Sequence, residues 1–205
     1  MATLDLITGL GNPGREYEAT RHNFGFLGVD ALLRAWTPLG TPSLISARKD
    51  PFELFKATAP GPQRIFLLKP LTYMNKSGEA VRRVLDYYHL DAGNLLVLHD
   101  EMDLPLGRMR LKKGGGNAGH NGLKSIDLHA GTPDYHRLRL GIGKPAGFEG
   151  ASFVLGRFAP FERPLLDDVL QAVVSGVELL IRGDFTAAQQ LCNGFTPSSA
   201  AGISG

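Results

Sequence analysis

The sequence predicts an α/β protein: a single-domain, three-layer sandwich in which a mixed, mostly parallel, twisted sheet lies between helices. Two patterns favour this fold class. Short segments typical of strands, bounded by Gly, Pro or Asp turns, are separated in several places by longer segments with helical apolar periodicity. In addition, Leu95–Leu98 is a continuous apolar run, which is typical of a strand covered on both faces.

The length of the chain fits one domain. The sequence has 205 residues, of which 43% are hydrophobic, and domains typically span roughly 100–200 residues. No internal repeat or long linker divides it, so we expect a single domain over residues 1–195. After Thr196 the chain contains only Pro, Ser, Ala, Gly and one Ile, and residues 196–205 are therefore expected to be disordered.

The expected strands are short segments rich in aliphatic residues: Leu4–Thr8, Leu44–Ala47, Glu53–Ala57, Arg64–Leu68, Leu95–His99, Arg108–Lys112 and Arg137–Ile142. In Arg108–Lys112 and Arg137–Ile142, basic and apolar residues alternate. Because neighbouring side chains of a strand point to opposite faces, both segments are predicted to be half-exposed.

The expected helices carry one apolar stripe each. The first runs from about Thr20 to Trp36 and ends before Pro38. Three others follow, at Glu79–Tyr88, Leu123–His129 and Leu165–Ile181.

Composition excludes several classes of protein. With Cys192 as the only cysteine, neither an internal disulfide nor a cysteine-rich zinc site can form. The apolar runs are far shorter than the ~18 residues that would span a bilayer, and the first residues lack a basic segment. We therefore expect a cytoplasmic protein with no membrane partner. The net charge of +2 does not indicate nucleic acid by itself, so the distribution of charge must decide.

The loop after the first strand matches a dinucleotide-binding fingerprint, Gly9-x-Gly11-x-x-Gly14. In an oxidoreductase of that type the third glycine lies in the following helix, whereas Pro13-Gly14 indicates a turn here. Asp30, at the distance of a ribose-binding acid, falls within the predicted helix. This alternative is therefore weak, and no cofactor is expected.

Polar clusters follow three of the predicted strands. The first contains Tyr17 and His22, the second Tyr73 and Asn75, and the third is His99–Asp103. Open α/β sheets bind ligands at the carboxyl ends of their strands.

Simpler explanations exist for parts of these clusters. Thr20, Asn75 or Ser77 would also fit as helix caps. Asp100, Glu101 and Asp103 could hold a hard cation, but no metal-binding spacing accompanies them. No metal is therefore expected.

The densest basic segment surrounds a glycine-rich loop, Gly114–Gly119. On the alternating strand before it, Arg108, Arg110 and Lys112 would share one face, with Met109 and Leu111 toward the core. Such a face attracts phosphate groups. Its other candidate contacts are Lys113 and Lys124.

A second basic strand repeats the pattern. Arg137 and Arg139 would share a face, with Leu138 and Leu140 inward. The glycine loop lacks the Gly-Lys-Ser/Thr ending of a nucleotide-binding P-loop.

Together, these segments resemble the bacterial peptidyl-tRNA hydrolases. The matching strings are Gly9–Gly25, Lys69–Val81, Leu95–Gly107, Gly114–Ile126 and Arg137–Pro145. The resemblance covers most of the chain and excludes its C-terminal tail. It implies a monomeric enzyme that cleaves the ester between a peptide and the 3′-terminal ribose of tRNA, so that both are recycled during translation and ribosome rescue.

The resemblance also implies roles for individual residues. The catalytic base falls on His22 and its orienting carboxylate on Asp100. Asn12 falls on the position that distinguishes N-blocked peptides. Four further positions contact the substrate or the tRNA end: Tyr17, Tyr73, Asn75 and Asn121.

Two features depart from the family pattern. Tyr73 stands where Phe is common, and Asn117-Ala118 replaces an expected His-Gly in the glycine loop.

The chemistry of the residues agrees with this implication. Water attacking an ester needs a base and donors for the oxyanion but no covalent intermediate, and no Gly-x-Ser-x-Gly motif is present. A neutral imidazole can serve as the base. A non-catalytic RNA-binding module stays open as an alternative, since it would need the cations but not a paired His22 and Asp100.

Overall fold

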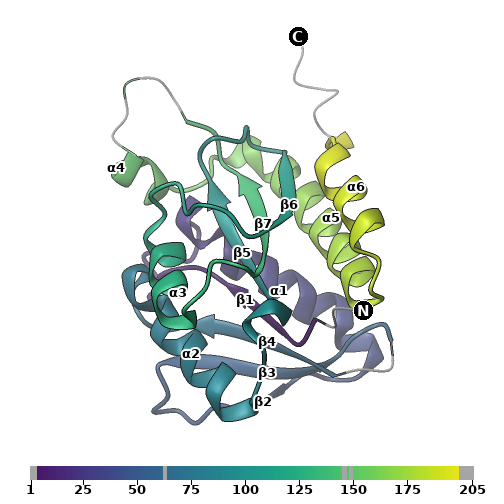
Figure 1. Ribbon diagram of the computed structural model, residues 1–205. Coiled ribbons are helices and arrows are strands. Elements are labelled where there is room, and N and C mark those ends of the chain that lie inside the picture. The colour runs from purple at the N-terminus through teal and green to yellow at the C-terminus, as the bar shows by residue number, and fades with distance from the viewer. Residues whose placement is uncertain (1–3, 62–63, 145–146, 148–149, 199–205) are drawn as a thin grey trace.

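The computed structural model describes residues 4–61, 64–144, 147 and 150–198 and contains a seven-stranded sheet with helices on both faces (Figure 1). The strands are β1 (Leu6–Gly9), β2 (Ser43–Leu44), β3 (Phe52–Thr58), β4 (Arg64–Pro70), β5 (Leu95–Glu101), β6 (Met109–Lys113) and β7 (His136–Gly141). The α-helices are α1 (Phe24–Trp36), α2 (Ser77–Tyr88), α3 (Asn121–Ala130), α4 (Gly150–Val154), α5 (Arg163–Ile181) and α6 (Phe185–Gly194). The predicted three-layer α/β sandwich is confirmed.

The sheet is mixed, with the strand order β2-β3-β4-β1-β5-β7-β6. The central strands β4, β1, β5 and β7 run parallel to one another, whereas β2, β3 and β6 each pair antiparallel at the edges. The carboxyl ends of the central strands therefore meet at one edge of the sheet, where ligands bind in open α/β folds.

Strand β5 contributes to both hydrophobic cores. Leu96 and Leu98 pack into the core that α1 and α5 cover, and Leu95 and Val97 pack into the core that α2 and α3 cover. All seven residues of β5 are buried, which confirms the prediction of a strand covered on both faces.

Helix α1 begins very close to the sheet because residue 25 is a glycine. A Cβ at Gly25 would lie 2.3 Å from both the Leu10 nitrogen and the Leu98 oxygen. Only glycine allows this approach, which brings the preceding 3₁₀ turn, Arg21–Asn23, against the ends of β1 and β5. His22 lies in that turn.

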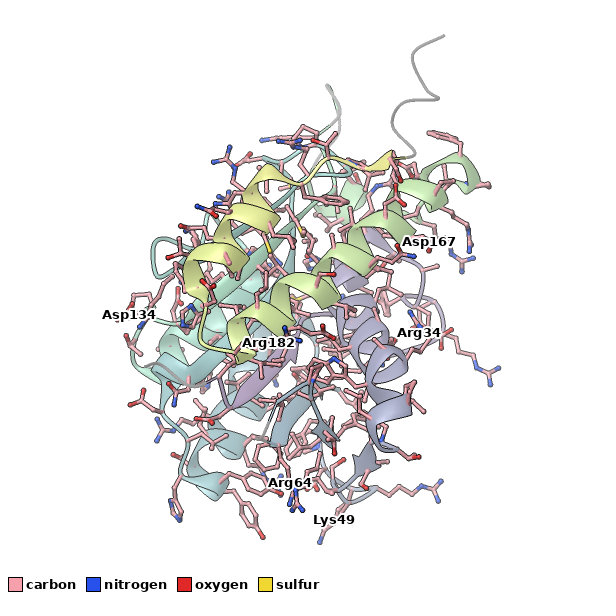
Figure 2. All side chains as sticks on the ribbon, turned by 90° about the vertical axis from the view of Figure 1, so that its right-hand side faces the viewer. Arg34, Lys49, Arg64, Asp134, Asp167 and Arg182 are labelled. Atoms are coloured by element: carbon pink, nitrogen blue, oxygen red, sulfur yellow. The ribbon has the colours of Figure 1, made fainter. Side chains whose placement is uncertain are left out.

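Helices α5 and α6 form the outer layer of the face opposite α2 and α3 (Figure 2). The charged side chains of Arg34, Asp167 and Arg182 are exposed on this side. Of the predicted tail, the structure describes residues 196–198, where Arg108 donates to Thr196 Oγ1 and Ser198 donates to Asp168. The rest of the tail lies outside the described residues. None of the described helices is long and apolar enough to cross a membrane.

Several predicted elements need correction. The strand expected at Leu44–Ala47 is only Ser43–Leu44, because Asp50 turns the chain by accepting from the Ala47 nitrogen. The short α4 was not predicted. Thr20 and Ser77 donate to main-chain carbonyls, and neither they nor Asn75 caps a helix through its side chain.

Strand β7 is buried rather than half-exposed. It lies between β5 and β6, and the Arg137 side chain on it is fully buried against Asp127 of α3. The alternation predicted for β6 is confirmed, with Met109 and Leu111 buried and Arg110 exposed.

Candidate active site

A cavity of about 570 Å³ lies at the carboxyl ends of the parallel strands. The loops after β1 and β4 and the end of β5 contribute to it, together with the residues before α3 and the short α4. Its lining consists of Asn12, His22, Tyr73, Met74, Asn75, Asp100, Glu101, Met102, Asn117, Ala118, Gly119, His120, Asn121, Gly150, Ala151, Val154 and Leu155.

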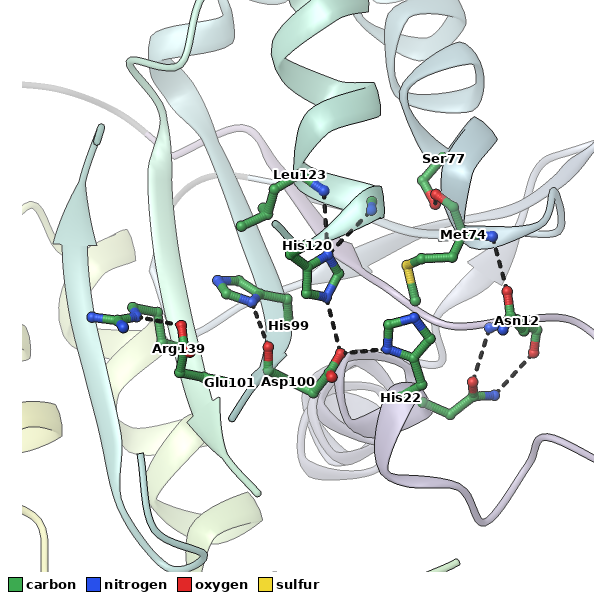
Figure 3. Close-up of polar contacts among 12 residues, drawn as sticks. Asn12, His22, Met74, Ser77, His99, Asp100, Glu101, His120, Leu123 and Arg139 are labelled. Atoms are coloured by element: carbon green, nitrogen blue, oxygen red, sulfur yellow. Dashed lines mark hydrogen bonds and ion pairs between the residues drawn. The ribbon is translucent and has the colours of Figure 1, made fainter. Parts of the chain in front are cut away.

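His22 and Asp100, which are far apart in the sequence, meet in this cavity (Figure 3). The distance between His22 Nδ1 and Asp100 Oδ1 is 2.9 Å. Since an ionised carboxylate can only accept, the proton of the neutral ring lies on Nδ1. The unprotonated Nε2 is thereby left available to act as a base.

Asp100 is kept ionised by its histidine neighbours. Burial by itself would raise the pKa of this carboxyl group, but the attraction and hydrogen bond of His120 and those of His22 outweigh it. The net pKa lies well below the usual carboxyl range. Asp100 therefore carries a full negative charge beside the His22 ring.

His120 is a site residue that the sequence reasoning missed. Its Nδ1 accepts from the Gly122 and Leu123 nitrogens at the start of α3, at 3.1 and 3.4 Å. The ring proton must therefore lie on Nε2, which donates to Asp100 Oδ1 at 3.0 Å. The available signal was a histidine three residues before a predicted helix, within the Gly-His-Asn-Gly string.

His99 supports the site by contacting both Asp100 and His120. Its Nδ1 donates to the main-chain oxygen of Asp100 at 2.8 Å, and its ring meets the His120 ring edge-on at 5.1 Å. Burial lowers the pKa of His99 to about 3, so the ring is neutral.

Asn12 is oriented by three hydrogen bonds. Its Oδ1 accepts from the Met74 nitrogen at 2.8 Å, and its main-chain nitrogen and oxygen both bind the Asn23 amide. The Asn12 Nδ2 has no partner in the described part of the chain, so it is a donor available to a ligand.

The remaining predicted substrate residues divide into two groups. Tyr73, Asn75 and Asn121 are exposed side chains that line the cavity. Tyr17 does not line it.

The predicted phosphate contacts lie outside the cavity. Arg110, Lys113 and Lys124 are exposed, whereas Arg108 and Lys112 are half-buried. Partial burial, together with repulsion from Arg139 and Arg137, lowers the pKa of Lys112.

The two arginines of β7 do not form a second free cationic row. Arg137 is fully buried and paired with Asp127, and Arg139 donates to Glu101 at 2.8 Å.

The carboxylates considered for a metal do not converge. Glu101 turns to Arg139 and accepts from the Asp103 nitrogen. Within the described residues, the group whose atom types could ligate a metal is His22, Asp100 and His120. In that group, His22 and His120 are each hydrogen-bonded to Asp100 Oδ1, and these two hydrogen bonds account for the closeness of the three side chains.

The glycine fingerprint after β1 does not form a dinucleotide site. Gly14 has a left-handed backbone (φ 115°), and α1 begins only at Phe24. Asp30 lies within α1 and pairs with Lys69 at 2.7 Å.

Comparison with known proteins gives a consistent result. Residues 6–200 match a sequence model of the family described as peptidyl-tRNA hydrolase. The chain is 50% identical to a peptidyl-tRNA hydrolase of Nitratidesulfovibrio vulgaris (strain DP4) over 196 residues, which cover 94% of this chain and 98% of the relative. A second relative, from Trichormus variabilis, is 47% identical over 197 residues, which cover 93% of this chain and 91% of that protein.

The fold agrees with a solved structure. A crystal structure of peptidyl-tRNA hydrolase from Acinetobacter baumannii matches with a TM-score of 0.88 and 38% identity, covering 97% of this chain and 98% of that one.

Proposed function

The chain belongs to the peptidyl-tRNA hydrolase family and is an enzyme that hydrolyses an ester bond in peptidyl-tRNA, and on this premise we propose that His22 is its general base. One observation carries the proposal: Asp100 binds His22 Nδ1 at 2.9 Å, which leaves Nε2 free at the cavity. Family membership decides against the non-catalytic RNA-binding module and the oxidoreductase that the sequence left as alternatives.

In the proposed reaction, His22 Nε2 removes a proton from a water molecule as the water oxygen attacks the ester carbonyl carbon. The imidazolium that forms is stabilised by the ionised Asp100. When the carbon–oxygen bond to the ribose breaks, the imidazolium returns the proton to the leaving ribose oxygen. The products are a free peptide and a free tRNA hydroxyl, and both become available again to translation.

Neutral amides complete the proposed site. The oxyanion needs donors that are already oriented before reaction, and Asn12 Nδ2 is fixed by the contacts of Asn12 with Met74 and Asn23. Asn75 and Asn121 provide further donors and acceptors at the cavity. We further propose that Tyr73, an exposed side chain at the cavity, contacts the tRNA end.

His120 extends the proposal beyond His22 and Asp100. Its Nε2–H shares Asp100 Oδ1 with His22, and its Nδ1 is fixed by α3. A neutral second donor keeps the carboxylate in place and ionised without competing for the water proton. We therefore assign His120 the role of positioning Asp100.

The test is turnover of an N-acylated aminoacyl-tRNA by His22→Ala. Loss of a general base should lower kcat by roughly 10²–10⁴-fold. His129→Ala is a matched control, because His129 lies on α3 outside the cavity. Near-normal turnover by a folded His22→Ala protein would refute the assignment of the base.

A further inference from the structure

The glycine-rich loop between β6 and α3 is attached to the protein body through Asn117. This residue, Ala118 and Gly119 line the cavity, and the next residue is His120. The Asn117 Nδ2 donates to Asp127 of α3 at 3.1 Å. The loop is therefore hydrogen-bonded to α3, the helix that directly follows it in the sequence.

Asp127 is held in place by two further hydrogen bonds. The hydroxyl of Tyr135 donates to its Oδ1 at 2.6 Å, and Arg137 Nη2 donates to the same oxygen at 3.2 Å. Arg137 is fully buried and lies 4.6 Å from the centre of the Tyr135 ring. Burial and the hydrogen bond to Asp127 raise the pKa of Tyr135, so its hydroxyl stays protonated as a donor.

Arg137 and Tyr135, which both bind Asp127, also bind the loop directly. Arg137 Nη1 donates to the Gly116 main-chain oxygen at 2.8 Å, and the Gly114 nitrogen donates to the Tyr135 oxygen at 2.9 Å. Arg137, which the sequence placed on a face shared with Arg139, is instead buried and supports the loop.

Asn117 also shapes the chain as it enters His120. Its Oδ1 accepts from the Gly119 nitrogen at 3.2 Å, and its main-chain oxygen accepts from the His120 nitrogen at 2.8 Å. Between these residues Ala118 adopts a left-handed backbone with φ 49°. Few residues other than glycine, asparagine and aspartate adopt this conformation readily, so the turn needs support from its neighbours.

We propose that Asn117 is a positioning residue for the hydrolysis: by linking Asp127 to the turn at Gly119 and His120, it sets the position from which His120 donates to Asp100. The inference rests on the proposed roles of His22, Asp100 and His120. Asn117 acts through the position of His120 and does not itself contact the reacting atoms.

The chemistry of the amide explains why asparagine suits this position. The side chain must donate to a carboxylate and accept from a main-chain N–H at the same time. Alanine can do neither, and aspartate would place a second negative charge against Asp127. Asn117→Ala therefore removes both side-chain hydrogen bonds without introducing a charge.

A double-mutant cycle on kcat tests the proposal. Asn117→Ala should lower kcat about 3- to 10-fold, the loss expected from one neutral hydrogen bond. His120→Ala should lower it by about 10- to 100-fold, as for a hydrogen bond to a charged group. In the His120→Ala background, Asn117→Ala should change kcat by less than about twofold, because its effect acts through His120.

A second readout follows the ring itself. The ¹⁵N chemical shifts of His120 should report a single tautomer with the proton on Nε2 in the native protein, and a mixture of tautomers in Asn117→Ala. Asn94→Ala is the matched control, since it also removes a hydrogen bond between an asparagine and an aspartate, at 2.7 Å to Asp5, outside the cavity. It should alter neither the tautomer nor kcat.

The outcomes separate this inference from the proposed function. The positioning role of Asn117 is overturned if the double variant loses kcat by the product of the two single losses, or if Asn117→Ala leaves the tautomer of His120 unchanged. Neither result would affect the proposed role of His22 as the general base. If folded His22→Ala turns over normally, the proposed mechanism fails first.

Discussion

At the scale of single residues, the site depends on one buried charge. Asp100 is 3% exposed, and its Oδ1 accepts from two histidine rings. A buried carboxylate is tolerated only when hydrogen bonds replace its hydration. Its two partners donate ring N–H groups to it, and its negative charge can stabilise the imidazolium that forms at His22.

Asp100→Asn should lower kcat by roughly 10²–10⁴-fold with little change in KM. The amide retains the shape of the carboxylate but lacks its charge, so the protonated His22 is no longer stabilised. The measurement is steady-state hydrolysis at saturating substrate. Asp103→Asn, a change at a nearby exposed carboxylate, is the control. A kcat within threefold of the native value would contradict this account.

The neutral His99 ring makes folding stability depend on pH. Its folded pKa is about 3, whereas an unfolded histidine titrates near 6.5. Between these values the unfolded chain binds a proton that the folded protein does not, so the free energy of unfolding falls as pH falls. Well above pH 6.5 the His99 ring is neutral in both the folded and the unfolded state, so this loss of stability is absent.

From pH 7 to pH 5, this difference should remove about 2 kcal/mol from the free energy of unfolding. His99→Asn keeps an N–H donor for the Asp100 carbonyl but does not titrate, so its loss over the same interval should be smaller by that amount. Urea denaturation of both proteins at both pH values gives the comparison, in which the other groups cancel. Equal losses would show that folded His99 is protonated in this range.

Residues with a distinctive local string were predictable from the sequence. His22, Asp100, Asn12, Tyr73, Asn75 and Asn121 all come together at the cavity. His120 and the buried Arg137 were missed or misread because their roles depend on partners from other elements. No local pattern reveals that Asp127 neutralises Arg137, or that Asp100 has room for a second ring.

At the scale of elements, Arg21 connects the turn that carries His22 to the segment after α4. Both Glu162 oxygens accept from Arg21 Nη2, at 3.0 and 2.8 Å, and the Arg157 oxygen accepts from Nη1. The guanidinium also lies over the rings of Phe153 and Phe158. The end of α4 and the residue after it border the cavity through Val154 and Leu155.

Arg21→Met should destabilise the fold by about 3 kcal/mol, because it leaves Glu162 as a largely buried charge without its arginine partner. Both side chains are little exposed, at 12% and 13%, so solvent screens the pair only weakly. Urea denaturation measures the loss. Adding Glu162→Leu should restore part of it, whereas Arg34→Met on the exposed face of α1 should cost little. A double variant no more stable than Arg21→Met would count against a buried ion pair.

Elements with a strong periodic pattern were predicted within a few residues, as for α5 and β5. The failures have physical reasons. β2 contains two residues and α4 five, too few for any periodicity to appear. In β7 the alternating charges indicated an exposed face, but a neighbouring helix supplied the countercharge.

At the scale of the whole molecule, the nearly neutral chain has an uneven distribution of charge. The net charge is only +2, yet Arg108, Arg110, Lys112 and Lys113 fall within six residues. Phosphate contacts position a nucleic acid without reading its sequence. This cationic surface, together with Lys124, stays our proposed contact for the tRNA backbone.

Replacing the exposed members Arg110, Lys113 and Lys124 together by glutamine should raise KM for a tRNA ester and leave kcat nearly unchanged. Each phosphate contact contributes about 0.7–0.9 to the slope of log affinity against log salt concentration, so the slope should fall by about 2–3. Arg34, Lys49 and Arg182, which are exposed on other surfaces of the molecule, provide a control triple with the same change in net charge. If the control raises KM equally, net charge alone attracts the substrate and the proposed surface is wrong. If only the first triple does so, position matters, and tRNA binds along β6 and the start of α3.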